Sequence, residues 1–213
     1  MAKPADGNST PPPDAKQRAL ADILTNDTPM KEQTIKNIFD IHLKKWVDNE
    51  LNSTPIDIEP EMADPSQDEN EEWRTWFPID SKVTDTEIEE IENRIGHKFP
   101  SDYITFLKHK HFYELNISEA SFCEHPVNTW RASLSEMIFN GYPREFLIDK
   151  GFIPFASWSD WGLLCFDTNR NKDDMNYPVV LWDHETAEEF QDQYQNFYDL
   201  IIKLDEKERK NIS

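Results

Sequence analysis

One stretch of the chain decides the fold: Val83-Thr84-Asp85-Thr86-Glu87-Ile88-Glu89-Glu90-Ile91-Glu92-Asn93-Arg94-Ile95-Gly96-His97-Lys98-Phe99-Pro100-Ser101-Asp102-Tyr103. It contains a complete short helix, including its start and its stop. Thr84 is a favourable N-cap, and Glu87 three residues later can reach back to the Thr84 amide to form a capping box. Gly96 can take the left-handed conformation that ends a helix. The stretch therefore predicts a folded element and not a linker.

The predicted helix has one apolar face and is followed by a second helix. Ile88, Ile91 and Ile95 fall on the same face at helical spacing, which indicates packing on a core. Acidic residues crowd the N-terminal end, where the helix dipole favours negative charge. After the turn at Phe99-Pro100, a second amphipathic helix is expected. Its apolar residues are Tyr103, Phe106 and Leu107.

Downstream, apolar segments alternate with polar turns, a pattern typical of strands. The expected strands are Phe152–Ala156, Trp161–Asp167 and Tyr177–Asp183. The polar stretch Thr168–Asn176 suits a hairpin between the last two. Ser133 and Glu136 offer another capping box, for a short helix that Gly141 could end. A final helix is expected from about Glu185. Its buried stripe would be Phe190, Tyr194, Phe197, Tyr198 and Ile201. This order predicts an α+β fold with an antiparallel sheet flanked by helices.

The N-terminal third reads as an appendage to this domain. Residues 1–27 are rich in proline and small polar residues, which predicts a disordered tail. Residues 28–51 predict a helical extension, with Thr28 as its cap and Pro29 at the first helical position. Its apolar face must dock on its own domain, on a second copy in a homodimer, or on a partner. Residues 52–72 are acidic and proline-rich, which predicts a solvated linker or an acidic arm for a basic partner.

The compact domain is expected to span residues 73–213, anchored at its start by Trp73, Trp76 and Phe77. The chain carries 22 Lys and Arg against 42 Asp and Glu, a formal net charge of -20. Such a field repels nucleic acid and anionic lipid and attracts a basic protein, although acidity also serves solubility alone. No apolar window is long enough to span a membrane, and the N-terminus has no secretory core. Two cysteines, Cys123 and Cys165, fit a reduced cytoplasmic protein, with a disulfide between them left open.

The residues offer little for catalysis. His109 and His111, with His125 or Cys123, could hold a metal ion, as a metal-dependent hydrolase would require. Their position at a helix end instead favours solvent-facing histidines, because side chains at i and i+2 diverge there. The sequence has no phosphate-binding glycine loop and no nucleophile-elbow or zinc-protease motif. We therefore expect no enzymatic activity and no cofactor.

The residues offer more for binding. Trp158 and Trp161 flank Asp160 in an expected turn, and tryptophan is enriched at interface hot spots. Either indole could instead fill the core. The other candidate partner-binding residues are acidic. They are Asp173 and Asp174 in the hairpin, and Asp183, Glu185, Glu188 and Glu189 at the expected start of the last helix. The second group could imitate nucleic-acid phosphates toward a nuclease, or could simply complement the helix dipole.

From Trp73 to Leu204 the chain resembles the SUKH superfamily. The resemblance lies in the acidic helix with its glycine stop, the Pro-x-x-Tyr-x-x-Phe-Leu helix and the ordered motifs that follow. These motifs are Phe152–Ala156, Asp160-Trp161-Gly162, Cys165-Phe166-Asp167, Pro178-Val179-Val180 and Phe190. The resemblance implies an interaction module without enzymatic activity. Bacterial members are typically immunity proteins that neutralise a cognate toxin, often a nuclease, and fungal members regulate cell-wall synthesis and signalling. The leading hypothesis is an immunity protein against a basic toxin, and a regulatory scaffold is the alternative.

Overall fold

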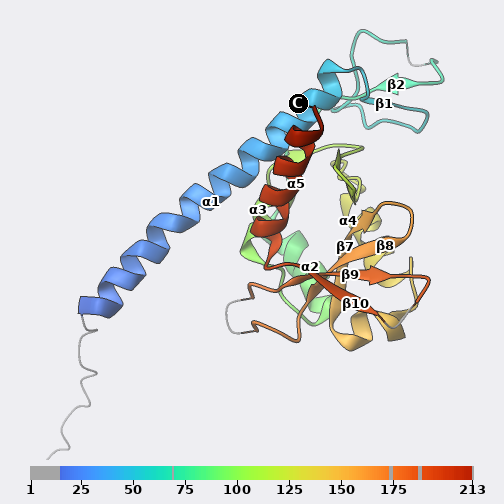
Figure 1. Cartoon of the computed structure of the whole chain (residues 1–213). Helices are drawn as coiled ribbons and strands as arrows, with labels where there is room; N and C mark the ends of the chain where they lie inside the picture. The colour runs from blue at the N-terminus through green and yellow to red at the C-terminus, as the bar shows by residue number, and fades with distance from the viewer. Residues whose placement is uncertain (1–14, 69, 173–174, 187–188, 213) are drawn as a thin grey trace, which may run out of the picture.

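The protein has an α+β fold built around a six-stranded antiparallel sheet, as the sequence predicts. The computed structural model describes residues 15–68, 70–172, 175–186 and 189–212, and side chains from residue 28 to residue 211 (Figure 1). The strand order in the sheet is β10-β9-β8-β7-β6-β5. Among the described residues, no helix combines the length and apolar content needed to cross a membrane.

The elements follow one another along the chain as follows. The α-helices are α1 (Ala15–Asp48), α2 (Asp85–Ile95), α3 (Ser101–Leu107), α4 (Trp130–Phe139) and α5 (Phe197–Ile212). Two short 3-10 helices are Arg144–Phe146 and Ile148–Lys150. The central sheet comprises β5 (Asn116–Ile117), β6 (Ala120–Phe122), β7 (Phe152–Trp158), β8 (Gly162–Asp167), β9 (Val179–Asp183) and β10 (Phe190–Tyr194). Two small ladders pair β1 (Ser53–Thr54) with β2 (Arg74–Thr75), and β3 (Ile79–Asp80) with β4 (Lys110–His111).

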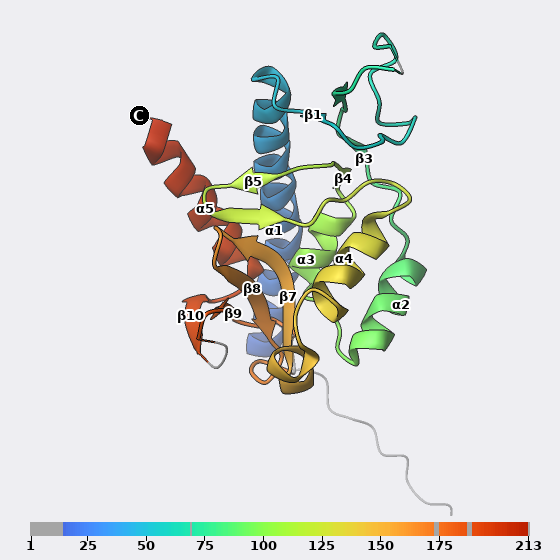
Figure 2. The same cartoon turned by 90° about the vertical axis from the view of Figure 1, so that its right-hand side faces the viewer.

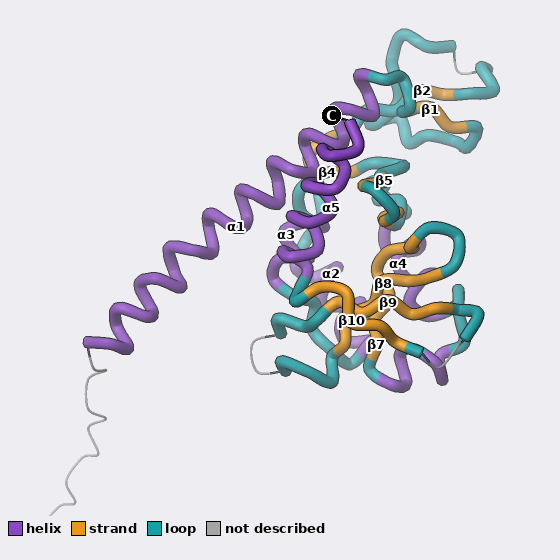
Figure 3. The backbone as a smooth tube through the Cα atoms, in the orientation of Figure 1, coloured by secondary structure: helices purple, strands orange, loops and turns teal. Residues whose placement is uncertain are grey.

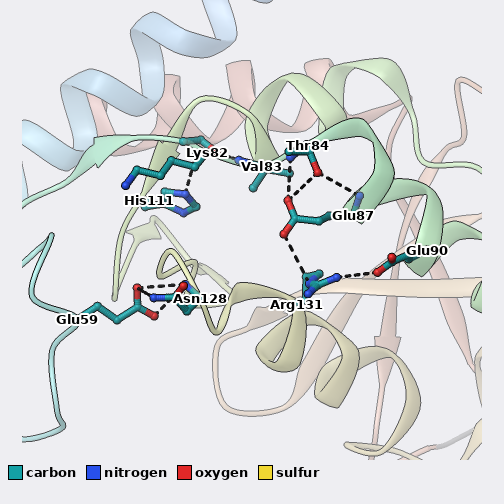
Figure 4. Close-up of polar contacts among 10 residues, drawn as sticks. Glu59, Lys82, Val83, Thr84, Glu87, Glu90, His111, Asn128 and Arg131 are labelled. Carbon is teal, nitrogen blue, oxygen red and sulfur yellow. Dashed lines mark hydrogen bonds and ion pairs between the residues drawn. The ribbon is translucent and has the colours of Figure 1, made fainter.

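The capping box predicted for α2 is formed. The Glu87 amide donates to Thr84 Oγ1 over 3.3 Å, and the Thr84 amide donates to Glu87 Oε2 over 2.9 Å (Figure 4). Gly96 ends the helix with φ 81°, in the left-handed region. The buried carboxylate of Glu92 then accepts from the Phe99 amide over 2.8 Å, which fixes the turn into α3. Short-range chemistry therefore sets both ends of α2.

Both faces of the central sheet are covered. On one face, α1, α3 and α5 build the main core, and Figure 2 shows α1 and α5 behind the strands. On the other face, the segment after α4 covers a smaller apolar cluster. The buried members of that cluster are Leu147, Leu163, Cys165, Val180 and Trp182. Cys123 and Cys165 are free thiols, so the disulfide left open by the sequence is not formed.

The N-terminal helix packs on its own domain. It begins at Ala15 and not at Thr28, so the prediction of a disordered tail is wrong from residue 15 onward, and residues 1–14 lie outside the described part. Pro29 lies inside the helix and not at its first position. The apolar face carries Ile35, Phe39 and Leu43, all buried against the main core. The helix contacts α3 and α5, so it forms part of the fold (Figure 1).

The segment predicted as an acidic linker, residues 52–72, is folded in the structure. Figure 3 shows it as loops joined to the short strands β1 and β2. Ile58 and Met62 are buried in the main core. Glu59 binds the start of α4, where its carboxylate accepts from the Asn128 amide over 2.9 Å (Figure 4). The linker prediction is therefore wrong, because contacts distant in sequence fix a segment whose composition is typical of disorder.

The predicted anchor at the domain start is correct for one residue of three. Trp76 is completely buried, whereas Trp73 is 56% exposed and Phe77 is 38% exposed. Of the three, only Trp76 faces the core. It follows β2 directly and lies next to the buried Asn52, whose side-chain amide donates to the Trp76 carbonyl. Two large apolar side chains are thus left on the outside of this segment.

The last helix begins later than predicted. Residues 190–194 form strand β10, with Phe190 opposite Trp182, and α5 starts only at Phe197. A spacing of four residues fits both a helix face and a strand face, so Phe190 and Tyr194 satisfied either period. The predicted capping box of α4 is also absent. Helix α4 starts after Thr129, so Ser133 lies inside the helix, and its hydroxyl donates to the Glu124 carboxylate before the helix.

Replacing Glu59 tests whether the acidic segment is folded. The Glu59→Ala variant removes the acceptor at the start of α4 and is expected to lower the free energy of unfolding by about 1 kcal/mol. The matched control is Glu61→Ala, which removes an exposed pair with Lys82 and should cost less than about 0.5 kcal/mol. Urea denaturation followed by tryptophan fluorescence measures both. Equal, negligible effects would show that residues 52–72 do not belong to the fold.

Candidate partner-binding surface

Two connections meet at one end of the central sheet. The turn 159–161 joins β7 to β8, and the loop 184–189 joins β9 to β10. The register sets Gly162 opposite both Trp158 and Asp183, so these connections are neighbours. The His184 amide donates to the Trp161 carbonyl over 3.3 Å. We call this end, with residues 158–161, 183–186 and 189, the sheet-end surface.

The two predicted tryptophans differ in exposure. Trp161 is 37% exposed and lies at the tip of the turn. Trp158 is half-buried, packs against the main core and has its ring centroid 6.4 Å from that of Tyr194. The adjacent Ser159 has φ 49°, and its amide donates to the Glu119 carbonyl over 2.8 Å, which fixes the turn. Trp161 is therefore available for contact, whereas Trp158 mainly supports it.

The acidic residues of the sheet-end surface do not lie at a helix start. The chain after β9 is a loop leading into β10, so the predicted role of these acids in complementing a helix dipole is wrong. Asp183 orders this loop, because its Oδ1 accepts from the Glu185 amide over 2.8 Å. Asp160, Glu185 and Glu189 are exposed. Three exposed carboxylates thus lie on the same two connections as Trp161, and their side chains have no hydrogen bond or ion pair among the described residues.

Some predicted residues are not brought to this surface. Asp173, Asp174 and Glu188 lie outside the described residues. The hairpin that contains the first two joins β8 to β9, at the opposite end of these strands. There, Arg170 pairs with Asp167 and Asp192, each over 2.6 Å. The predicted set is therefore divided between the two ends of the sheet.

Sequence reasoning missed Glu119 in the turn between β5 and β6. Antiparallel pairing of β6 with β7 sets Ala120 opposite Trp158, which brings Glu119 beside the sheet-end surface. Its carboxylate pairs with Lys207 of α5 and accepts from Ser118. No local signal pointed to Glu119, because its position depends on strand pairing over a long sequence separation.

A comparison with known protein families fits this geometry. The family model SUKH_5, described as SMI1-KNR4 cell-wall, matches residues 65–204, more than half of the chain. The chain belongs to the SUKH superfamily. SUKH proteins are generally non-enzymatic immunity or regulatory proteins, and membership supports a role of this broad kind. No curated protein matches the chain.

Two histidines of this SUKH chain, His111 and His125, are structural. His111 and His125 are buried and stacked, with ring centroids 5.0 Å apart. Nε2 of His111 accepts from the Lys82 amide over 2.9 Å (Figure 4), and its Nδ1 donates to the His125 carbonyl over 2.8 Å. His125 Nε2 donates to the Leu107 carbonyl over 2.8 Å. The prediction of a solvent-facing side chain, made for His109 and His111, is therefore wrong for His111.

The alternative of a metal-dependent hydrolase gains no support from these contacts. His109 bonds Asp40 over 2.8 Å, away from the stacked pair. Within residues 15–68, 70–172, 175–186 and 189–212, no group of three or more His, Cys, Asp or Glu is arranged to hold a metal ion. Burial also raises the pKa of the Cys123 thiol to about 12, so this thiol is a poor metal ligand and nucleophile.

The stacked histidines predict loss of stability in mild acid. Burial, reinforced by neighbouring His111, lowers the pKa of His125 from 6.5 to about 3, and burial also lowers the pKa of His111. Below pH 6.5 the His125 side chain is protonated in the unfolded chain but stays neutral in the folded chain, so protonation favours unfolding. Stability should therefore fall with decreasing pH, with a slope from His125 that approaches about 1.4 kcal/mol per pH unit well below pH 6.5, and His111 should add to this fall.

Urea denaturation between pH 6.5 and about pH 5 measures this slope, above the range in which most carboxylates titrate. In the His125→Gln variant the amide can still donate to the Leu107 carbonyl, and the slope should become shallower. The control is His184→Gln at an exposed position, which should leave the slope unchanged. A stability that is constant over this window in the native chain would contradict the assigned burial.

Proposed function

We propose that this protein is an immunity protein that binds a cognate toxin and blocks its active face. One observation carries the proposal: the fold gathers exposed Trp161 and the exposed carboxylates of Asp160, Glu185 and Glu189 on the sheet-end surface. An aromatic side chain surrounded by acids suits a basic protein partner, because tryptophan supplies contact area and the acids supply charge complementarity.

The net charge of -20 supports a basic toxin such as a nuclease. Nucleases carry basic clefts for phosphates, and an acidic surface can occupy such a cleft in place of the substrate. Long-range attraction raises the association rate, and salt screens it over about 8 Å at physiological ionic strength. Neutralisation then follows from exclusion of the substrate, so the bound protein needs no chemistry of its own.

The family description favours a second candidate, a regulatory scaffold of cell-wall synthesis. The matched model carries the words cell-wall, which are said of that family. Both candidates use the protein as a binding module, and they differ in the partner. A toxin gene beside the gene for this protein supports the immunity role. Its absence, together with binding to a component of cell-wall synthesis, supports the scaffold.

Charge removal at the sheet-end surface tests the proposed function. The triple variant Asp160→Asn, Glu185→Gln, Glu189→Gln should slow association with the product of the neighbouring gene about tenfold at low salt. Trp161→Ser should mainly speed dissociation, also about tenfold, because it removes contact area. Surface plasmon resonance at several salt concentrations measures both rates.

The matched control removes the same number of charges elsewhere, through Glu89→Gln, Glu114→Gln and Glu145→Gln, all at exposed positions. It should change association much less than the sheet-end triple variant. Equal effects of the two triple variants on the association rate would show that the charge attraction is nonspecific, and would contradict a binding role for the sheet-end surface. Association that is indifferent to salt in the native chain would overturn the electrostatic part of the proposal.

A further inference from the structure

A second part of the surface also combines acids with exposed apolar side chains. Residues 51–77, here called the acidic lobe, contain eight acidic residues and a single basic one, Arg74. Of the eight large apolar side chains that are exposed among the described residues, four lie in this lobe. They are Leu51 at 53%, Ile56 at 48%, Trp73 at 56% and Phe77 at 38%. Exposed apolar side chains that gather in this way mark interaction sites.

The register of β1 and β2 places these side chains on one side. Ser53 pairs with Thr75 and Thr54 with Arg74, and the Trp76 amide bonds the Asn52 carbonyl over 2.9 Å, so Leu51 lies opposite Phe77. Side chains alternate between the two faces of a strand. Since Trp76 and Asn52 are buried, the positions of Leu51, Phe77 and Trp73 fall on the outer side. We call these three residues the apolar ridge.

The ridge is held in place by the ordered lobe. Gln67 donates its side-chain amide to the Trp73 carbonyl over 2.8 Å and accepts from the Thr75 amide over 2.6 Å. On the inner side, Trp76 is fully buried, with its ring centroid 6.1 Å from that of Tyr113. The Tyr113 hydroxyl accepts from the Glu59 amide over 2.7 Å. A backbone held at the Trp73 carbonyl and at the next three residues fixes the position from which the indole extends, which lowers the entropy cost of binding.

A hollow beside Phe77 offers room for an apolar side chain. Its volume is about 360 Å³, and its apolar walls come from Phe77, Pro78 and the α1 residues Leu43 and Val47. The charged groups around it are already paired with one another. Lys44 pairs with Asp48, Lys110 with Asp80, and Asp40 with His109. An incoming apolar group therefore meets a rim whose charges are satisfied.

The charges of the lobe define the kind of partner. Asp64 and Asp68 are used in local turns with Ser66 and Asn70, and Glu61 pairs with Lys82. Asp57 and Glu72 are exposed on the lobe, and the structure gives their carboxylates no ion-pair partner among the described residues. We propose that the apolar ridge binds a segment of a partner protein that combines lysine or arginine residues with apolar side chains.

This surface is distinct from the sheet-end surface and shares no residue with it. The kind of partner is inferred from the exposed apolar side chains and the acids of the lobe alone, so the inference stands whether or not the partner is a toxin. The occupant is a basic, partly apolar segment, and a second copy of this chain is the competing possibility. The copy fits less well, because the lobe is acidic and would face another acidic surface.

A peptide titration of the full chain tests the inference. The probe is a synthetic peptide of alternating lysine and leucine residues, and its counterpart alternates glutamate and leucine. Amide and indole signals in nitrogen-15 NMR spectra report where the peptide binds, and tryptophan fluorescence reports its affinity. The lysine peptide should shift signals of Trp73, Thr75 and Phe77, whereas the glutamate peptide should shift none of them.

The double variant Trp73→Ser, Phe77→Ser should weaken binding of the lysine peptide about tenfold or more. Both side chains are exposed, so an unchanged unfolding midpoint verifies that this variant folds. The control Trp161→Ser removes an exposed tryptophan from the other surface and should leave peptide affinity unchanged.

Three outcomes would overturn the inference. The first is equal affinity of the native chain and the double variant, and the second is a spread of signal shifts over all acidic faces. The third is a dimer in sedimentation experiments that the double variant abolishes, because it assigns the ridge to a second copy. Failure of the sheet-end variants to affect toxin binding has no bearing on this titration, so the two proposals fail independently.

Discussion

Tyr103 packs against five aromatic rings, and this cluster joins the helices to the sheet. Its ring centroid lies 5.2 Å from those of Phe99, Phe166 and Phe197, and 5.6 Å from those of Phe106 and Phe155. These rings come from α3 and the turn before it, from β7, from β8 and from α5. Phe106 extends the contact to Phe39 of α1, with centroids 4.5 Å apart. The cluster therefore joins α1, α3 and α5 to the central strands β7 and β8.

The central sheet, which this cluster holds, also sets the position of the sheet-end surface. Strands β7 and β10 are not neighbours, yet Trp158 approaches Tyr194, and Phe152 stacks on Phe190 with centroids 3.7 Å apart. These two pairs join opposite corners of β7 and β10, as expected for a strongly twisted sheet. The pairing of β8 with both β7 and β9 brings the turn 159–161 and the loop 184–189 together, and the α1 helix holds the start of the acidic lobe through the bond from the Leu51 amide to the Trp46 carbonyl. Binding surfaces on rigid supports need little reorganisation when a partner arrives.

The sequence predicted those features that local chemistry determines. The capping box of Thr84 and Glu87, the stop at Gly96 and the strands at Phe152, Gly162 and Val179 were all readable from short patterns. The α+β class and the superfamily followed from their order. Trp161 was left open between the core and the surface, and the structure shows it 37% exposed; its role in binding, and that of the acids near it, is a proposal.

The features that the sequence did not predict depend on distant contacts. The composition of residues 52–72 predicted a linker. The contact that holds this segment, the bond from the Asn128 amide to Glu59, joins residues 69 positions apart and leaves no local sequence signal. A spacing of four residues hid strand β10 within an apparent helix face. The charged setting of Lys108 and Lys110 suggested solvated histidines, whereas pairing of β3 with β4 buries His111.

Amide hydrogen exchange of the isolated chain tests the central claim most directly, namely that the acidic segment belongs to the core and presents a fixed surface. The amides of Trp76 and Phe77 donate to the Asn52 and Met62 carbonyls over 2.9 and 2.8 Å. They should be strongly protected and approach the protection of Phe166 in the central sheet. Exchange of Trp76 and Phe77 at the rate of an open chain, with Phe166 still protected, would contradict the account.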